Sequence, residues 1–472
     1  MDESSRRGKS LLTRRKFIKA GVAGLAGGAL LRLAPVTAGN ADFHLSAAHG
    51  QVRLARDQQL PTEVMYYNQS IPGPLIRIPR ARESVIVFEN ALDESSSVHW
   101  HGLRIENAMD GVPGMTQAPV MPGEKFEYRL TPPDAGTYWY HTHQRSWAQL
   151  ALGLAGVLIV EEDDPPAVDQ DLVFAIDDWR LDAEMQIDRE SLGAMHDWAH
   201  GGRMGNVITV NGETEKVYRV ARGERIRLRL LNIANARTMN LLFNEPRISV
   251  IAIDGQPVEP FTPPDGRIRL APGQRSDVII DMNADPGHRS LIEVVIGDYA
   301  YEVASFEYGE KIRREHTPDT PIRLEQNPLQ ATRLPETFEH VPLHMQGGAM
   351  GGMRSAVYEG KEMGVSELIQ HRKIWAINGI AGMPEQPLFS VRRGTAVSLD
   401  VVNDNSWPHA MHLHGHHFIY HRSPEFWRDT ALFTRGEEGT MRFVADNPGK
   451  WLIHCHMVEH MAGGMLTWFE VT

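Results

Sequence analysis

The residues with the most distinctive chemistry lie near the end of the chain, where the single cysteine of the sequence stands between two histidines. His454, Cys455 and His456 follow an apolar run that predicts a buried strand, so both imidazoles should point to one face and the thiol to the other. His460 and Met465 follow the cysteine at intervals of five residues. A thiolate, imidazoles and a weak thioether ligand favour a blue copper site, whereas a zinc site usually uses more than one cysteine.

Further histidines that could bind metal gather in four groups, which hold ten of the 22 histidines of the chain. On a strand, both rings of a His-x-His pair lie on one face, about 6.5 Å apart along the chain, which suits neighbouring ions. One such pair is a weak signal, because buried histidines are common, but four groups together predict a pocket for several metal ions. The groups are His99 and His101; His141 and His143; His409, His412 and His414; and His454, His456 and His460.

The elements that must position these residues are short strands. Apolar runs separated by Pro-Gly, Asn-Gly and Asp-Gly turns recur throughout, and long helical periodicity is scarce, so we predict an all-β fold built from β-sandwiches. The clearest runs are 84–88, 126–130, 137–140, 225–231, 278–281, 396–402 and 450–453.

The chain also resembles itself in three places, which predicts three domains of one kind. Each repeat opens with a strand that carries an asparagine, passes through a basic turn, and continues to a strand that ends in asparagine. The pairs of asparagines are Asn68 and Asn90, Asn211 and Asn232, and Asn378 and Asn403. The first and third repeats then run into histidine motifs, whereas the middle repeat has none. We therefore predict a domain at residues 39–165, a spacer domain without metal ligands at 166–312, a polar linker at 313–334, and a domain at 335–472.

The first 38 residues predict a signal peptide of the twin-arginine export pathway. Arg14 and Arg15 precede an apolar run from Ala20 to Leu31, and small residues follow at 36–38. This run is too short to span a bilayer, which needs about 20 residues, so we expect no stable membrane anchor. The expected location is the periplasm, or outside the cell if the host has a single membrane.

The charge of the chain excludes some partners. The net charge is −12, and it becomes −18 when the eight basic and two acidic residues of 1–38 are removed. This acidity argues against nucleic acid and anionic lipid as partners. A single cysteine cannot form an intrachain disulfide, even in an oxidising compartment. We expect a monomer.

These motifs resemble those of the multicopper oxidases, the family of laccases, bacterial copper-efflux oxidases and ascorbate oxidases. The resemblance covers the whole mature chain and implies three cupredoxin-like Greek-key domains with four copper ions. Type 1 copper would be held by His409, Cys455, His460 and Met465. The other three form a trinuclear cluster: type 2 copper would be held by His99 and His412, and the type 3 pair by His101, His141 and His456 on one ion and His143, His414 and His454 on the other.

The resemblance also implies a reaction. Type 1 copper would take single electrons from a donor, and Cys455 would pass them to His454 and His456 at the cluster, where dioxygen is reduced to water. Asp110 matches the position of an acid in bacterial members and is the candidate proton relay, although an ordinary Asp-Gly turn is the alternative. Some members have a glutamate directly after the ligand matched by His460, whereas this chain has Met461 there; whether Glu459 replaces it stays open.

The electron donor is indicated by methionines rather than by the histidine motifs. Met345, Met350 and Met353 lie in a glycine-rich stretch, and thioethers favour Cu(I), so we expect a cuprous oxidase slightly more than a phenol oxidase of the laccase type. Packing methionines are the alternative. His416 and His417 exceed the ligand count and should pack around the site, and the remaining histidines, such as His196, His200, His340 and His344, should be surface residues.

Two functions of other classes can be weighed against an oxidase. A protein that only sequesters copper would not need Cys455 to join two kinds of site, and oxygen uptake would separate the two. A structural relative without copper would have lost ligands, which this chain retains.

Overall fold

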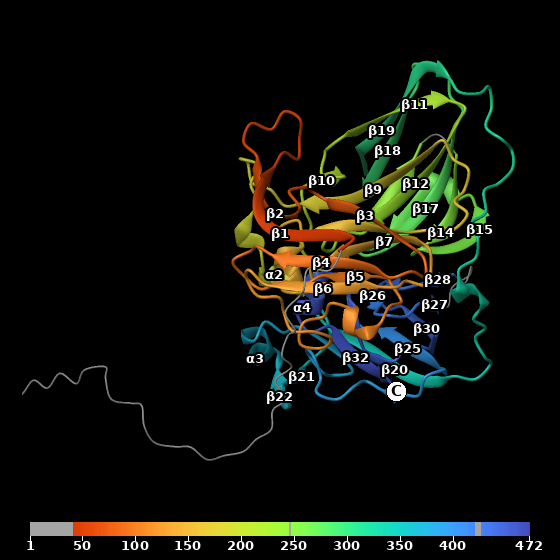
Figure 1. The fold of residues 1–472 in the computed structure, drawn as a ribbon. Helices are drawn as coiled ribbons and strands as arrows, with labels where there is room; N and C mark the ends of the chain where they lie inside the picture. Colours follow the sequence, from red (N-terminus) through yellow and green to blue (C-terminus); the bar gives the residue numbers. More distant parts are fainter. Residues whose placement is uncertain (1–40, 245–246, 421–425) are drawn as a thin grey trace, which may run out of the picture. The chain divides into compact units, whose positions relative to one another are not determined.

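The computed structural model describes residues 41–244, 247–420 and 426–472, which are mostly β-strands (Figure 1). The prediction of an all-β fold is confirmed. The predicted signal peptide lies outside the described residues. In the described part of the chain, no helix combines the length and the apolar character needed to cross a membrane.

The first sandwich holds one hydrophobic core between two four-stranded sheets, ordered β2-β1-β4-β6 and β3-β8-β7-β5. Parallel pairs, β1 with β4 and β3 with β8, join antiparallel ones, so the chain crosses between the sheets. The strands are β1 Phe43–Val52, β2 Thr62–Tyr67, β3 Gly73–Pro79, β4 Ser84–Asn90, β5 His99–His101, β6 Lys125–Leu130, β7 Gly136–His141 and β8 Ala155–Glu161.

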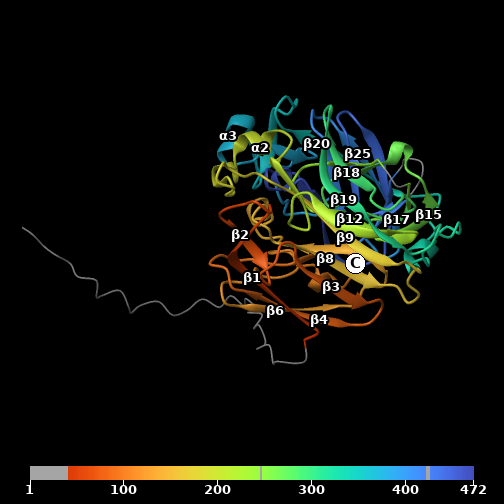
Figure 2. The ribbon, with the colours of Figure 1, turned by 90° about the horizontal axis from the view of Figure 1, so that it is seen from above.

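The middle sandwich packs a six-stranded sheet, β10-β9-β12-β17-β14-β15, against a five-stranded one, β11-β19-β18-β13-β16. Figure 2 shows β9, β12 and β17 side by side. The strands are β9 Gln170–Trp179, β10 Val207–Val210, β11 Lys216–Arg222, β12 Glu224–Asn232, β13 Met239–Phe243, β14 Ile248–Ile253, β15 Gln256–Phe261, β16 Arg267–Leu270, β17 Arg275–Met282, β18 Arg289–Ile296 and β19 Tyr299–Ile312.

The third sandwich repeats the plan with the sheets β23-β20-β25-β30-β27-β28 and β24-β32-β31-β26-β29, and β21 and β22 form a hairpin beside it. The strands are β20 Glu339–Gly347, β21 Ser355–Tyr358, β22 Lys361–Gly364, β23 Trp375–Ile377, β24 Ser390–Val391, β25 Thr395–Asn403, β26 His409–Leu413, β27 Phe418–Tyr420, β28 Trp427–Arg428, β29 Thr430–Phe433, β30 Glu438–Ala445, β31 Gly449–Cys455 and β32 Leu466–Val471.

Helices are short and lie in the connections between strands. The α-helices are α1 Ser146–Gln149, α2 Met195–Ala199, α3 Val365–Gln370 and α4 Val458–Ala462, and the 3₁₀ turns are Asn107–Met109, Arg189–Ser191, Pro264–Gly266 and Pro328–Ala331. Each of the seven predicted runs lies on a strand, namely β4, β6, β7, β12, β17, β25 and β31.

The repeated asparagines explain why the three sequences fold alike. Asn68, Asn211 and Asn378 adopt left-handed φ values of 49°, 52° and 50°, which asparagine tolerates better than most residues. Each amide oxygen accepts a backbone N–H, and each amide nitrogen donates to a carbonyl on the strand beside it. The same local bonds therefore fix the start of each repeat.

Candidate metal centre

The first candidate site gathers His409 from β26, Cys455 from the end of β31, and His460 from α4. The cysteine Sγ lies 3.5 Å from His409 Nδ1 and 3.7 Å from His460 Nδ1, and these two nitrogens are 3.0 Å apart. The loop after Cys455 folds back, because the Cys455 N–H donates to the Met465 carbonyl at 3.1 Å. Gly464 permits this turn, since a side chain there would meet the Trp375 carbonyl. The loop thus brings Met465 beside the cysteine.

The remaining eight histidines meet where two pairs of neighbouring strands face each other. In the first sandwich β5 pairs with β7, which places His99 opposite His141. In the third, β26 pairs with β31, which places His412 opposite His454. Candidate ligand atoms lie within 4.8 Å of one another in three groups: His99, His101 and His412; His101, His141 and His456; and His143, His414 and His454. The last two match the two expected type 3 sets.

The hydrogen bonds show that facing nitrogens are acceptors. His414 Nδ1 donates to Asp110 Oδ2 at 2.9 Å, and His454 Nδ1 donates to the Cys455 carbonyl at 3.0 Å. A neutral imidazole has one N–H, so both Nε2 atoms carry lone pairs. These Nε2 atoms face each other at 3.0 Å. Two lone pairs cannot bond to each other, but a cation can accept both.

The first site follows the same rule. His460 Nε2 donates to the His200 carbonyl at 2.7 Å and His409 Nε2 donates to Asn405 Oδ1 at 2.9 Å, so both Nδ1 lone pairs point at the cysteine sulfur. Two imidazoles and a thiolate suit copper. Further ring nitrogens are buried without a hydrogen-bond partner among the described residues: His99 Nε2, His101 Nδ1, His143 Nε2, His412 Nε2 and His456 Nδ1.

Burial keeps these rings neutral, as metal ligands must be. It lowers the pKa of His101, His141, His143, His409, His414, His454 and His456 well below the usual value, and neighbouring histidines lower it further. Burial lowers the pKa of His460 to about 4 and raises the pKa of the Cys455 thiol to about 12. A bound cation would reverse the effect on the thiol, so metal binding at neutral pH should release a proton.

Asp110 lies directly behind two candidate ligands. Its side chain is 2% exposed, one oxygen accepts from His414 Nδ1, and the other lies 3.3 Å from His99 Nδ1. The His99 Nδ1 also reaches the Asp110 carbonyl at 2.7 Å. Gly111 is required beside it, because a Cβ there would meet the Val98 carbonyl at 1.8 Å. The acid is therefore placed to orient both rings, and to exchange protons beside them.

A buried ion pair that the sequence analysis missed supports the cluster from the middle domain. The Arg275 guanidinium binds both oxygens of Asp429 at 2.9 and 2.6 Å, and Asp429 accepts from His101 Nε2 at 3.0 Å. Burial alone would raise the pKa of Asp429, but Arg275 and His101 hold it well below the usual value. Gly273 lies on the same turn, where a Cβ would come within 2.9 Å of the His101 ring. The middle domain thus closes one wall of the cluster.

Other expected residues lie beside the sites. His416 and His417 are buried and bond to the carbonyls of His414 and Asp254, so both pack around the centre as expected. Glu459 is 1% exposed and accepts from the Asn235 side chain of the middle domain at 2.8 Å. Burial raises the pKa of Glu459 to about 7.

The methionines do not share one loop, so that expectation was wrong. Met345 lies on β20 and is fully buried in the core of the third sandwich. Met353 packs against a small apolar core under the β21–β22 hairpin, whereas Met350 is 77% exposed. Met345 is buried because every second residue of β20 faces the core, and Met345 lies at one of these positions.

Among the histidines expected at the surface, His196 and His340 are exposed and His344 is half-buried. His200 departs from the expectation, because it is half-buried and its carbonyl bonds to the ligand His460.

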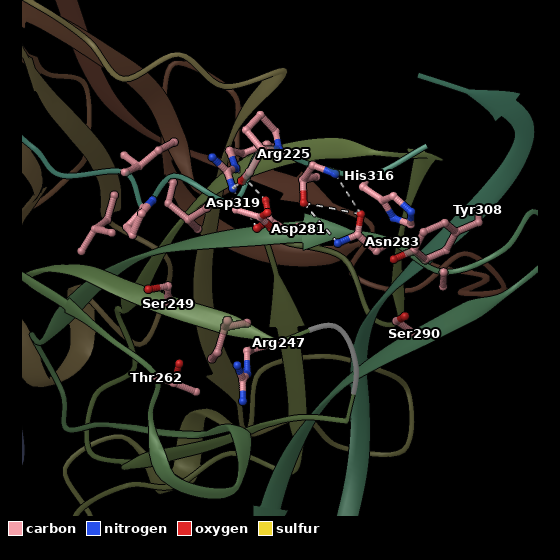
Figure 3. A pocket seen from close by; sticks show the side chains of 18 residues that line it. Arg225, Arg247, Ser249, Thr262, Asp281, Asn283, Ser290, Tyr308, His316 and Asp319 are labelled. Atoms are coloured by element: carbon pink, nitrogen blue, oxygen red, sulfur yellow. Dashed lines mark hydrogen bonds and ion pairs between the residues drawn. The ribbon is translucent and has the colours of Figure 1, made fainter. Parts of the chain in front are cut away.

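A separate cavity of about 760 Å³ lies in the middle domain and contains none of the predicted ligands (Figure 3). Arg225 and Asp281 point toward each other at its edge and form a bidentate pair. Asn283 bonds to Thr317 nearby. Since Arg225 is also tied to the carbonyls of residues 318 and 320, this arrangement fastens the predicted linker to the sandwich.

Comparison with known proteins finds matches over most of the chain. Family profiles described as multicopper oxidase match residues 49–165, 170–292 and 358–472. The chain is 28% identical to the multicopper oxidase MmcO of Mycobacterium tuberculosis over 85% of this chain and 82% of that protein.

Solved structures agree. Lac15 from a marine microbial metagenome is 35% identical, with a TM-score of 0.73 over 91% of this chain and 100% of that one. A Campylobacter jejuni multicopper oxidase, described as a metallo-oxidase, is 25% identical, with a TM-score of 0.74 over 91% and 90% of the two chains.

Proposed function

We propose, on the premise that the chain belongs to the multicopper oxidase family, that it couples one-electron oxidation of Cu(I) to the four-electron reduction of dioxygen to water. The observation that carries this proposal is the set of buried imidazole lone pairs that face one another around Cys455 and between the outer sandwiches. Four copper ions would fill it: one type 1, one type 2 and two type 3. Bound copper would supply single-electron transfer and the binding of dioxygen.

The protein's own residues hold and connect these sites. Cys455 is joined by single peptide units to His454 and His456, so the backbone gives a short covalent connection between the two centres. The tautomers are fixed by carbonyl and carboxylate acceptors, which removes the need to reorganise the rings on binding. Asp110, beside His99 and His414, is placed to pass protons to oxygen as it is reduced.

Two observations bear on the donor. The exposed thioethers of Met204 and Met350 favour Cu(I), and both residues belong to segments that meet at Ala199 and His200, where the His200 carbonyl accepts from His460. The Campylobacter jejuni relative is described as a metallo-oxidase. A phenolic or aromatic donor is the second candidate. A cleft of about 400 Å³ bordered by Ile380, Met383 and Leu388 supports this candidate. The cleft lies beside the loop that carries Met465, because the neighbouring Gly382 N–H donates to the Gly464 carbonyl.

We further propose that the chain acts in the periplasm as a monomer after export by the twin-arginine machinery. The Arg14-Arg15 motif and the short apolar run after it support export. Copper tolerance would be the physiological role of cuprous oxidation in that compartment. Fractionation of cells that express the full chain, beside an Arg14→Lys, Arg15→Lys variant, tests the route: the variant should stay in the cytoplasm.

One experiment tests the reaction. The purified protein is loaded with copper, its copper content is measured, and oxygen uptake is followed with Cu(I) or a phenol, with and without added Cu(II). Four donor electrons should be consumed per dioxygen, and Cys455→Ser should show no uptake. A protein that only sequesters copper would bind the metal and consume no oxygen with either donor, which would contradict the proposal.

A further inference from the structure

A small cavity of about 240 Å³ lies where the middle sandwich meets the third. Most of its wall comes from β14, β15, β16 and β17 of the middle sandwich, and Arg428 of β28 contributes from the third sandwich. Among the described residues that line it, none is a candidate copper ligand. The cavity is thus distinct from the candidate metal centre, and it is smaller than the roughly 300–1,000 Å³ of a site for a drug-sized molecule.

Arg428 carries a positive charge that no described residue neutralises by direct contact. Its Nε is buried without a hydrogen-bond partner, and its Cζ lies 5.7 Å from the centre of the Tyr420 ring. Burial lowers the pKa of Arg428, and the charges of Asp254 and Asp429 offset this effect only in part. A buried cation without a hydrogen-bonded counter-charge is unfavourable, so a bound anion would stabilise it.

The two acids that act on Arg428 are held by other groups. Asp254 accepts the main-chain N–H of Arg275 at 2.9 Å and that of Thr430 at 3.4 Å. Asp429 binds the Arg275 guanidinium through both of its oxygens. Both acids are 0% exposed, so neither can turn toward Arg428 without breaking a buried contact.

Two further arginines line the cavity from its solvent side. Arg267 and Arg269 flank the buried Ile268 on β16, so both side chains leave the same face of this strand. Both are exposed, and neither forms an ion pair or a side-chain hydrogen bond with a described residue. Although the chain has a net charge of −12, these arginines give the cavity a positive potential that attracts anions.

Much of the remaining wall is apolar. Val250 and Pro263 are buried, and the Phe261 ring stacks on Phe426 with the ring centroids 5.5 Å apart and 9° between the planes. A small inorganic anion would make no use of these surfaces. A carboxylate attached to an apolar body would cover them and gain free energy from doing so.

We infer that this cavity binds a small aromatic monocarboxylate, with the carboxylate paired to Arg428 and the ring against Phe261 and Pro263. The planar guanidinium can donate two parallel N–H bonds to a carboxylate, which makes this pairing both strong and oriented. Arg267 and Arg269 would draw the anion in from solvent.

A monoanion suits the cavity better than a dianion such as phosphate. The carboxylates of Asp254 and Asp429 act on Arg428 through space, so they would repel the second negative charge. The bound acid would also join two sandwiches, because Arg428 belongs to the third and the apolar wall to the middle one. A ligand that binds only the folded chain stabilises it, so binding should raise the melting temperature.

The test measures benzoate binding to the copper-loaded enzyme at neutral pH, by calorimetry and by the melting temperature. Benzoate should bind once per chain and raise the melting temperature, whereas benzamide, which has a similar shape without the charge, should do neither. Arg428→Met should weaken benzoate binding about tenfold or more, because a charge-assisted contact in a buried place is lost. Arg267→Gln and Arg269→Gln, at exposed positions, should each weaken it about two- to fivefold.

Arg442→Met is the matched control for Arg428→Met. Arg442 lies on β30 of the third sandwich, its Nε is also buried without a hydrogen-bond partner among the described residues, and its Cζ lies 5.3 Å from the centre of the Phe338 ring. It does not belong to the residues that line this cavity. The variant should leave benzoate binding unchanged.

Several outcomes would overturn the inference. Benzoate affinity that survives in Arg428→Met would place the ligand elsewhere, for example on a copper ion, and a change in the copper absorption spectrum would show this. Equal binding of benzamide would remove the role of charge, and equal binding of inorganic phosphate would remove the role of the apolar wall. Without ligand, Arg428→Met should melt close to the parent chain, since its guanidinium forms no ion pair with a described residue, so lost binding would not reflect unfolding. None of these outcomes depends on the electron donor.

Discussion

Arg275 provides the sharpest test of how the middle domain supports the cluster. Replacing it with methionine removes the guanidinium that binds Asp429 at 2.9 and 2.6 Å, and both side chains are at most 1% exposed. The carboxylate would be left buried beside His101 without its cation. Removal of one partner from a buried pair costs about 3–5 kcal/mol, so Arg275→Met should lower the free energy of unfolding by that amount.

A second effect, on copper content, should show whether Arg275 also helps to position the candidate ligand His101 through Asp429. Asp429 fixes the His101 tautomer through Nε2, and loss of such an outer contact weakens metal affinity by about 10- to 100-fold. Arg275→Met should therefore contain less cluster copper after dialysis against a weak chelator, and should lose turnover in proportion. Arg275→Lys should recover part of the copper, because it restores the charge without the two-point contact.

Arg227→Met is the matched control for this prediction. Arg227 is 1% exposed and binds Asp277 of the same sandwich at 2.6 Å and Glu162, which follows β8 of the first sandwich, at 2.7 Å, but it touches no candidate ligand. Its loss should destabilise the chain to a similar degree in urea and leave copper content intact. Equal copper content in the two methionine variants would refute the reasoning, because stability alone would then explain Arg275.

Four further outcomes are expected. Cys455→Ser should abolish donor oxidation and the blue colour while part of the cluster copper remains, as metal analysis and absorption would show. Met465→Leu should raise the type 1 reduction potential, measured by redox titration, with copper content kept, because a weak axial donor to Cu(II) is lost. Asp110→Asn should slow steady turnover but not the single-turnover reduction of type 1 copper; equal slowing of both steps would contradict a relay. The copper-free protein should lose stability in urea as pH falls below about 6.5, the unfolded histidine pKa, and continue to lose it toward pH 4, because burial holds the pKa of folded histidines such as His460 at about 4 and the unfolded chain binds more protons.

Much of the fold follows from local sequence. Runs of alternating or apolar residues between glycine turns specify strands wherever one face must be buried, which accounts for β4, β12 and β25. The asparagines at 68, 211 and 378 each supply a left-handed turn and two bonds to the adjacent strand, so a short sequence carries a long-range contact.

The pairs of histidines that point the same way could also be inferred from the sequence, because strand alternation fixes which histidines share a face. The geometry groups His143 with His414 and His454, although His143 lies about 270 and 310 residues before them in the sequence. Only the internal repeat and the family resemblance linked them beforehand; spacing along the chain does not. The prediction for Met345 was wrong, because a methionine on an alternating strand can face the hydrophobic core as readily as it can face a bound metal ion.

The supporting groups of the middle domain could not be predicted in this way. Arg275 contacts Asp429, and the His200 carbonyl contacts His460, across 154 and 260 residues of sequence. Neither contact leaves a recognisable sequence motif. A single arginine does not show its partner, and every residue has a main-chain carbonyl. These contacts appear only when three sandwiches are docked.

That docking gives the middle domain a role beyond spacing. The cluster ligands come from the first and third sandwiches, and their facing lone pairs, such as His414 Nε2 and His454 Nε2, cannot satisfy each other without a cation. Arg275 joins the middle sandwich to Asp429 of the third, which in turn holds His101 of the first. Copper bound by His101 and His456 would therefore add its binding free energy to the contact between all three sandwiches, and loss of copper would loosen them together.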